Sequence, residues 1–510
     1  MKQTDAAFAV VANNCTIPVS DIPLHPFVVF ERLILDAVAA DQRVSALFGV
    51  VSQKSGKLEL YVVLSDDAQN QINICRAEVS GSGYPSLTPK IPQAHLFERE
   101  IAEQFGILPE GHPWLKPVRY CASWSGKDAW NRTADEPIVP AVTDFYRVEG
   151  EQIHEVAVGP VHAGVIEPGH FRFQCHGELM YHVEIALGYQ YRGIEEAMLG
   201  ERKNRNIHYI ETAAGDTTVG HTITYCQIIE ALSHTQKPAR AQVIRGIALE
   251  LERIANHIGD LGALAGDVGY LPTSSFCGRI RGDFLNITAL ICGNRFGRGL
   301  VVPGGTGYDL DDSMISEILT RLAVLHQEAR DAVNLLWITP SVMARFEDTG
   351  ILTNEFAIKM GITGPAARAA GVGRDIRYDQ PSGVYRFSQV PVSTCESGDV
   401  FARAFVRWME IEQSLEFITA QLKALSKGSI RVAYGKLEPE SLSLALNEGW
   451  RGEICHVAIT NTDGGFARYK IVDPSFHNWI GLAQVLRNEE ISDFPLCNKS
   501  FNLSYCGHDL

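Results

Sequence analysis

Apolar residues recur at helical spacing through much of the second half of the chain. In residues 238–261 they follow one another at steps of four, three, four and three, which gives one continuous helical stripe: Ile247, Leu251, Ile254, Ile258 and Leu261. Residues 309–336 repeat this pattern behind an acidic start, where carboxylates favour a helix N-terminus. Similar patterns predict helices over 178–199, 218–234, 275–293 and 399–427. Several long amphipathic helices indicate a bundle core.

The first 120 residues show a different pattern. Residues 57–64 (KLELYVVL) contain short alternating runs that favour a strand, whereas 26–40 and 93–105 have helical spacing. The apolar run at 6–12 follows a lysine, as the core of a secretion signal does. Its seven residues lead into two asparagines, which favours a strand instead.

The boundary between the two patterns lies in a stretch with little periodicity. Residues 123–144 carry two prolines and no regular apolar spacing. We therefore predict an α+β domain over residues 1–121, a linker over 122–150 and a mainly α-helical domain over 151–510. A chain of 510 residues is long enough to build two such cores.

Composition limits the partners and the compartment. The formal net charge of −15 argues against nucleic acid as a partner, because phosphates attract basic surfaces. No 18 apolar residues run together without a charge, so no membrane-spanning helix is predicted. The eleven cysteines lie at least nine positions apart, unlike the ligands of zinc ribbons or ferredoxin-type clusters. We expect reduced, buried thiols in a cytosolic protein and assign any iron-sulfur cluster to a partner.

Two smaller groups of residues have structural interpretations. Gly304, Gly305 and Gly307 follow a proline but lack the pattern of a phosphate-binding loop, so they predict a tight backbone turn. Five arginines stand out in an acidic chain, and arginines of this kind usually pair with buried or interfacial carboxylates. We predict such pairing for Arg368, Arg374, Arg377, Arg403 and Arg407.

Residues 95–120 (HLFEREIAEQFGILPEGHPWLKPVRY) carry a charged helical segment followed by a G-H-P turn. This stretch resembles the signature of the 30-kDa subunit of respiratory complex I, in which E-R-E and G-H-P recur at this spacing. Glu98, Arg99 and Glu100 are typical of a solvated helix face. We interpret them as residues for docking between subunits rather than for catalysis.

Residues 159–196 (GPVHAGVIEPGHFRFQCHGELMYHVEIALGYQYRGIEE) resemble the opening of nickel-iron hydrogenase large subunits and of the complex I 49-kDa subunit. The resemblance continues through 295–305, 361–385, 398–407, 450–453 and 473–479. A 30-kDa-like region followed by a 49-kDa-like region matches the large subunit of group 4, formate hydrogenlyase-type, energy-converting hydrogenases. The resemblance implies a hydrogenase large-subunit fold for the second domain.

The metal ligands of that family are absent from this sequence. Nickel-iron hydrogenases hold their metal on two C-x-x-C pairs, and this chain contains no C-x-x-C. By the resemblance, Ala214 and Thr217 occupy the first pair of positions, and Ser504 and Gly507 the second, although a one-residue shift would let Cys506 keep the last. Alanine offers no ligand, and hydroxyls cannot replace bridging thiolates. We therefore predict no nickel-iron centre and no metal at these positions.

Quinone is the cofactor that the complex I resemblance brings to this site. In those relatives the headgroup lies between a histidine, matched here by His170, and a tyrosine, whose position falls on Gly215. One of the two residues that usually contact the headgroup, the tyrosine, is therefore missing. His170 and Thr217 are the predicted quinone-binding residues, and no other cofactor is predicted on this chain.

The resemblance also gathers titratable residues around the former metal site. We predict catalytic roles for His162, His170, Asp216, His221 and Arg451, and place Ser504, Cys506 and His508 beside them. Histidines and an aspartate together could carry protons or bind a borderline metal such as zinc. Lone histidines are also common as hydrogen-bonded structural residues. Spacing leaves these alternatives open.

Two functions follow from the resemblance. In the first, the chain is the large subunit of a complex I-like, hydrogenase-related oxidoreductase complex that transfers electrons, with quinone and NAD(H) as the complex's implied ligands, and couples this transfer to ion movement. In the second, it is a non-catalytic scaffold or coupling subunit. Both imply a small iron-sulfur subunit and antiporter-like membrane subunits as partners. Both also imply a cytoplasmic chain held at the inner face of the cell membrane by those partners.

Overall fold

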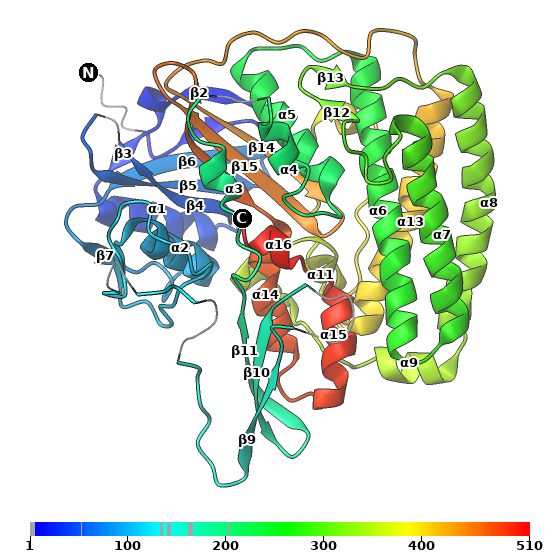
Figure 1. The fold of residues 1–510 in the computed structure, drawn as a ribbon, viewed down its shortest axis with the longest axis horizontal. Coiled ribbons are helices and arrows are strands. Elements are labelled where there is room, and N and C mark those ends of the chain that lie inside the picture. Colours follow the sequence, from blue (N-terminus) through cyan, green and yellow to red (C-terminus); the bar gives the residue numbers. More distant parts are fainter. Residues whose placement is uncertain (1–5, 53, 133–135, 140–143, 162–166, 202–203) are drawn as a thin grey trace.

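The computed structural model describes residues 6–52, 54–132, 136–139, 144–161, 167–201 and 204–510. Figure 1 shows three parts: a sheet with its helices near the N-terminus, a bundle of long helices on the opposite side, and a long hairpin projecting between them. Within the described parts no helix is both long and apolar enough to cross a membrane.

The N-terminal part is built on an antiparallel sheet in the order β1-β6-β5-β4, with β3 pairing in parallel to β6. Helix α1 packs on β4 and β6, and α2 packs on β4. The strand at 6–12, the strand at 57–64 and the helices at 26–40 and 93–105 are confirmed. The elements are β1 (Ala9–Val11), β2 (Thr16–Pro18), β3 (Leu24–His25), α1 (Phe27–Ala39), β4 (Arg43–Val51), β5 (Leu58–Asp66), β6 (Gln71–Glu78), β7 (Gly83–Pro85), α2 (His95–Phe105) and β8 (Leu108–Glu110).

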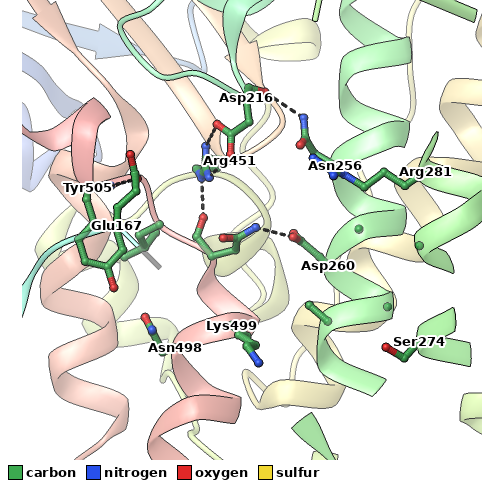
Figure 2. A pocket seen from close by; sticks show the side chains of 16 residues that line it. Glu167, Asp216, Asn256, Asp260, Ser274, Arg281, Arg451, Asn498, Lys499 and Tyr505 are labelled. Carbon is green, nitrogen blue, oxygen red and sulfur yellow. Dashed lines mark hydrogen bonds and ion pairs between the residues drawn. The ribbon is translucent and has the colours of Figure 1, made fainter. Parts of the chain in front are cut away.

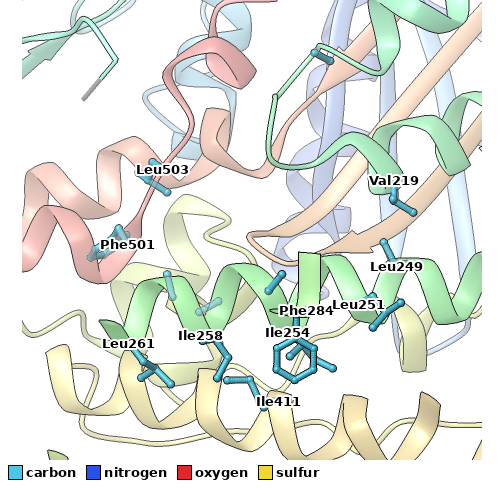
Figure 3. Packing of buried hydrophobic residues seen from close by; sticks show 14 of the residues in the cluster. Val219, Leu249, Leu251, Ile254, Ile258, Leu261, Phe284, Ile411, Phe501 and Leu503 are labelled. Carbon is cyan, nitrogen blue, oxygen red and sulfur yellow. The ribbon is translucent and has the colours of Figure 1, made fainter. Parts of the chain in front are cut away.

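Long helices form the bundle, with α6 packed against α7 and α13, and α8 against α7 and α13. The predicted stripe of α6 is fully buried, and Figure 3 shows Ile254 and Ile258 beside Ile411 of α13. This burial of aliphatic side chains is the main stabilising contribution in the bundle. Its helices are α5 (Thr218–Leu232), α6 (Ala239–Asp267), α7 (Leu271–Cys292), α8 (Asp312–Trp337) and α13 (Val400–Lys423).

The region after residue 150 contains the predicted long helices but also a sheet, so it is mixed rather than clearly mainly helical and the predicted fold class is correct only in part. An antiparallel sheet of β14 (Ser441–Gly449), β15 (Gly452–Thr460) and β16 (Phe466–Val472) adds β2 from the N-terminal region at its edge. These strands are buried on both faces, so their side chains do not alternate between apolar and polar. Periodicity therefore gave no strand signal there.

The predicted helix over 178–199 was also wrong. That stretch contains β11 (Leu179–Ala186), which pairs with β10 (His170–His176), and the short helix α3 (Ile194–Ala197). β10 also pairs with β9 (Ile153–Val158), and its Phe171 and Phe173 are fully buried. Hairpin pairing between β10 and β11, closed by a turn at residues 177–178, overrode the local helical spacing.

Short elements complete the described chain. The glycines after Pro303 form the predicted tight turn, with φ of 85° at Gly304, between two two-residue strands. The remaining elements are α4 (Asn206–Ile210), β12 (Val301–Val302), β13 (Gly305–Thr306), α9 (Pro340–Phe346), α10 (Asn354–Met360), α11 (Gly364–Ala369), α12 (Ile376–Asp379), α14 (Pro474–Val485), α15 (Phe494–Phe501), α16 (Tyr505–His508) and the 3₁₀ turns η1 (Val19–Asp21), η2 (Pro92–Ala94), η3 (Gly383–Arg386) and η4 (Ile491–Asp493).

The interpretation of the E-R-E segment as a solvated face was wrong for both glutamates, which are fully buried. Glu98 accepts hydrogen bonds from Ser86, Thr88 and the backbone of residue 87. Glu100 pairs with Arg119 and, at 2.6 Å, with Lys470 of β16. The compensating partners come from distant sequence, so a buried charge network holds the N-terminal part against the rest of the chain.

A second buried network lies inside the bundle and confirms most of the predicted arginine pairs. Arg368 bonds Glu410 and Glu448, and Arg377 bonds Glu250. Arg407 pairs with Asp260 inside the bundle, whereas Arg374 pairs at the surface with the exposed Asp41 of the N-terminal region. Arg403 is the exception, because it donates hydrogen bonds to the Ser500 hydroxyl and the carbonyl of Gly398.

His257 gives this network a defined response to acid. Its Nε2 lies 2.8 Å from Glu410, and burial lowers the pKa of His257 to about 4. In the unfolded chain a histidine titrates near ~6.5. Between these values the unfolded chain binds a proton that the folded chain does not. The contribution of neutral His257 to the free energy of unfolding is therefore complete above pH ~6.5 and is lost as the pH falls toward 4.

We predict that His257→Gln, which keeps a donor for Glu410 but cannot be protonated, will reduce the loss of stability between pH 6.5 and 5. The expected difference is up to about 1.4 kcal/mol per pH unit in the free energy of unfolding. Urea unfolding of the full chain at several pH values measures it. The exposed His154→Gln is the control and should leave the wild-type slope unchanged. An unchanged slope in His257→Gln would contradict the assignment.

Candidate functional site

Asp216 and Arg451 form the centre of the candidate site. Asp216 precedes α5, and Arg451 lies in the turn between β14 and β15. The two side chains form a bidentate pair, with nitrogen-oxygen distances of 2.6 and 2.7 Å (Figure 2). Burial alone would lower the pKa of Arg451, but the Asp216 carboxylate raises it above the usual range. Arg451 therefore carries a permanent charge.

Neighbouring groups hold this pair in place. The guanidinium lies 3.9 Å from the ring centre of Trp450, and its Nε donates to the carbonyl of Asn502. Trp450 donates in turn to Thr217 Oγ1 at 3.1 Å. Asn256 of α6 donates to the carbonyl of Asp216 at 2.9 Å. Stacking and hydrogen bonding on several sides give Arg451 one orientation.

The residues at the former ligand positions do not fit a nickel-iron centre. Ala214 and Gly507 have no ligand atom, and Thr217 Oγ1 already accepts from Trp450 and from Arg451. Ser504 Oγ accepts from the backbone of Gly507 at 2.9 Å and so caps α16. Hydroxyls are poor substitutes for thiolates as ligands of nickel and iron.

Cys506 does not restore the ligand set. Its thiol lies 3.4 Å from the Ser504 hydroxyl, and burial raises the pKa of Cys506 to about 11. The thiol is therefore protonated at neutral pH, whereas a metal ligand is a thiolate. Across the described parts of the chain, no three His, Cys, Asp or Glu side chains are grouped as a metal site requires.

A cavity of about 580 Å³ opens beside the Asp216–Arg451 pair. Small residues on α6 and α7 leave the space: Gly259, Gly262, Ala263, Ser274 and Gly278. Figure 2 shows charged side chains around it, which come from α6, α7, α15 and three loops: Glu167, Asp216, Asp260, Arg281, Arg451 and Lys499. The charged and polar lining suits a small polar ligand better than a bulky apolar one.

Tyr505 of α16 lines this cavity, and the sequence analysis missed it. Burial raises the pKa of Tyr505 to about 12, so the hydroxyl keeps its proton at neutral pH. The ring packs against Trp479 at 4.9 Å between centres. A tyrosine is therefore present in the cavity, on a different element from the one that the resemblance implied. Its position in the sequence could have indicated this role, because Tyr505 lies between Ser504 and Cys506, which the family resemblance places at the site.

His221 belongs to a buried line of four side chains behind this site. Its Nε2 lies 3.0 Å from Asp473 Oδ2, and its Nδ1 lies 3.1 Å from His456 Nε2. His456 Nδ1 lies 3.0 Å from the hydroxyl of Tyr469. All four side chains are almost completely buried. Burial holds the pKa of His456 well below its usual range.

Asp473 connects this line to the former ligand positions. Burial would raise the pKa of Asp473, but the His221 hydrogen bond and nearby charges hold it below the usual range. The carboxylate also lies against Gly507, where an added Cβ would come within 2.7 Å of Asp473 Cγ. His456 and Tyr469 carried no signal in the sequence, because their strand neighbours give them the appearance of ordinary core residues.

The remaining predicted residues lie apart from this centre. His170 is buried at the start of β10, with Nδ1 3.3 Å from the carbonyl of Gly159, and it does not line the cavity. His508 pairs with Asp509 at 2.8 Å and faces a different cavity. His162 lies outside the described residues. The structure thus brings together Asp216, Thr217 and Arg451, with His221 behind them.

Two family models match the chain. The model of the respiratory-chain NADH dehydrogenase 30 Kd subunit matches residues 30–133, and that of the 49 Kd subunit matches residues 267–443. A solved structure of the membrane-bound sulfane sulfur reductase, an archaeal respiratory membrane complex, has a chain that superposes with a TM-score of 0.67. The match covers 72% of this chain and all of that one. At 23% identity this likeness concerns the fold.

Similar proteins include several hydrogenase subunits. Formate hydrogenlyase subunit 5 of Escherichia coli is 29% identical, over 90% of this chain and 84% of its own length. The carbon monoxide-induced hydrogenase of Rhodospirillum rubrum is 30% identical, over 68% of this chain and 97% of its own length. The membrane-bound hydrogenase subunit alpha of Pyrococcus furiosus is 29% identical, over 68% of this chain and 85% of its own length. The chain belongs to the family of group 4 hydrogenase large subunits and complex I 49-kDa subunits, with a 30-kDa-like region fused ahead of the 49-kDa-like one.

Proposed function

We propose that this chain is the large subunit of a membrane-associated, complex I-like oxidoreductase complex that works without a nickel-iron centre. The relatives are hydrogenase and NADH-quinone oxidoreductase subunits, which supports membership of such a complex. The observation that carries the proposal is the cavity beside Asp216 and Arg451. Every former ligand position there lacks a thiolate, yet titratable side chains still surround an open space.

The proposed reaction is reduction of a carbonyl-type acceptor such as a quinone. Reduction to the hydroquinone adds two electrons and two protons. An iron-sulfur cluster in a small partner subunit supplies the electrons. Residues of this chain deliver the protons to the acceptor. Arg451 stabilises the negative charge that develops on the acceptor oxygen, because its guanidinium is fixed before the reaction. Tyr505 donates a hydrogen bond, and then a proton, to the same kind of oxygen.

The line behind the cavity has two arrangements of its protons, and this supports a role in proton supply. With His221 neutral, its Nε2–H donates to Asp473, so its Nδ1 accepts from His456, whose other nitrogen accepts from Tyr469. A proton added at His221 Nδ1 reverses the hydrogen bonds to His456 and Tyr469. The line can therefore take up and release one proton without moving its heavy atoms.

The alternative is a non-catalytic scaffold that joins an iron-sulfur partner to membrane subunits. The absence of a thiolate at all four former ligand positions favours it. So does the buried network of Glu100, Arg119 and Lys470, which holds the N-terminal region to the rest of the chain. In both functions the chain lies at the inner face of the cell membrane, bound to partner subunits. Ion translocation belongs to the membrane subunits that the family resemblance implies. The two functions differ in whether cavity residues affect turnover.

We predict that Tyr505→Phe will lower turnover of the complex about tenfold, because it removes a proton donor and keeps the ring that packs on Trp479. The assay uses the complex purified with its native partners, reduced methyl viologen as donor and menadione as acceptor. Tyr308→Phe, at an exposed position outside the cavity, is the matched control. Wild-type rates in Tyr505→Phe, or no turnover by the wild-type complex, would favour the scaffold.

We predict that His221→Gln will lower turnover about a hundredfold and will change the shape of the pH-rate profile, because it interrupts the line between Asp473 and His456. Glutamine keeps a donor for Asp473 but cannot accept a proton at neutral pH. Turnover across pH 5 to 9 measures the effect, and the melting temperature shows whether the fold is kept. A purely structural histidine would change the melting temperature and leave the shape of the pH profile intact.

A further inference from the structure

A second cavity, of about 440 Å³, lies at the junction of the N-terminal region and the rest of the chain. Its walls come from α2 and the segment after it, from β11 and from α14. It shares no lining residue with the cavity beside Arg451. Its volume lies in the range of natural ligand pockets. The proposed electron transfer makes no use of it.

The wall of this junction cavity is largely apolar. Buried side chains contributed by all three elements form it: Leu96, Val118, Val183, Leu187, Trp479 and Ala483. At its edge Trp114 and Tyr146 are 40% and 49% exposed, with ring centres 6.1 Å apart. Tyr146 also packs on His182 at 4.9 Å. Exposed aromatic rings beside an apolar wall favour binding of an apolar group.

Positive charge is in excess around the same cavity. Its lining holds Arg99, Lys116 and Arg487 but one carboxylate, Glu184. Lys116 pairs with Glu184 at 2.5 Å and lies 4.2 Å from the ring centre of Trp114. The lining thus carries three positively charged side chains and one negatively charged side chain, an excess of two positive charges. Such an excess beside apolar surface favours an anion.

Arg99 shows this imbalance most clearly. Its Nε and Nη2 donate at 2.8 Å to the carbonyls of Lys116 and Pro117. Among the described residues no carboxylate lies within ion-pair distance of it, and the same holds for the exposed Arg487. Burial lowers the pKa of Arg99, and the more distant Glu103 and Glu184 carboxylates oppose this effect only in part.

The histidines around the cavity add no charge at neutral pH. Burial lowers the pKa of His95 to about 3 and that of His112 to about 4. Burial also lowers the pKa values of His182 and His508. The arginines and Lys116 therefore set the sign of the local charge. The neutral rings extend the flat, weakly polar wall.

We propose that this junction cavity binds an amphiphilic anion, with its apolar body against the wall and its carboxylate or phosphate among Arg99, Lys116 and Arg487. A neutral amphiphile would leave the positive charges uncompensated. A free inorganic anion would leave the apolar wall without contacts. The ligand touches both regions of the chain, so its binding stabilises their junction. This proposal is independent of the function proposed for the first cavity.

Calorimetric titration of the native complex with three probes tests the site: dodecanoate, dodecanol and inorganic phosphate. We expect dodecanoate to bind about tenfold or more tightly than dodecanol, because only the acid can meet the cations. Phosphate alone should bind more weakly than dodecanoate. Equal affinity for dodecanoate and dodecanol would overturn the proposal, and so would no binding of dodecanoate.

Two variants locate the binding. Ala483→Phe fills the cavity and should abolish dodecanoate binding while the complex stays folded and keeps its turnover. Arg487→Gln, at an exposed position where folding does not depend on the side chain, should weaken dodecanoate about three- to tenfold and leave dodecanol unchanged. The matched control is Arg386→Gln, an exposed arginine outside the cavity. Wild-type dodecanoate binding in Arg487→Gln and in a folded Ala483→Phe would place the ligand elsewhere and overturn the proposal.

Mass spectrometry of the extracted native complex distinguishes the sources of the anion. A phospholipid or a free organic acid recovered in proportion to the chain, and lost in Ala483→Phe, would support the proposal and identify the class. A peptide of a partner subunit occupying the cavity, shown by cross-linking at position 114, would overturn it.

Discussion

The ion pair between Asp216 and Arg451 is the interaction on which the candidate site depends. It joins the loop before α5 to the turn between β14 and β15, and it fixes the Arg451 guanidinium beside the former ligand positions. The two charges compensate each other, so the pair is a neutral, hydrogen-bonded unit beside the former ligand positions. Stacking on Trp450 restricts the orientation of Arg451 further. The prediction of no nickel-iron centre therefore rests on the missing thiolates at those positions.

Buried polar networks organise the rest of the molecule around this site. The pairing of Glu100 with Arg119 and Lys470 holds the N-terminal region in place, and the cluster of Glu250, Arg368 and their partners lies inside the bundle. Breaking one partner of such a network leaves an uncompensated buried charge, which costs several kcal/mol. These networks give a rigid frame, and the two cavities open where small residues or a junction between regions interrupt the packing.

Local spacing predicted the parts of the fold that depend on local interactions. The stripe of α6 was visible because every fourth or third residue packs on the same neighbours. β11 was mistaken for a helix because several of its apolar residues also fall at helical spacing, and its strand conformation comes from hairpin pairing with β10. Glu98 and Glu100 resembled a solvated face because Ser86, Arg119 and Lys470, which compensate them, lie elsewhere in the sequence.

The candidate site was predictable where the family resemblance supplied positions. Asp216, Thr217 and Arg451 do lie together, and His221 lies behind them. His456 and Tyr505 act through contacts that only the folded chain creates, since each comes from an element far from the motif it meets. The resemblance gave no role to Tyr505, because this residue lies on α16 and not beside Gly215.

Elemental analysis of the complex purified with its native partners tests the central claim most directly. The account predicts iron in the amount that partner clusters explain, and nickel below about 0.1 per copy of this chain, because no thiolate set remains to hold it. Nickel at about one per chain would contradict the account and would restore hydrogen chemistry to the site.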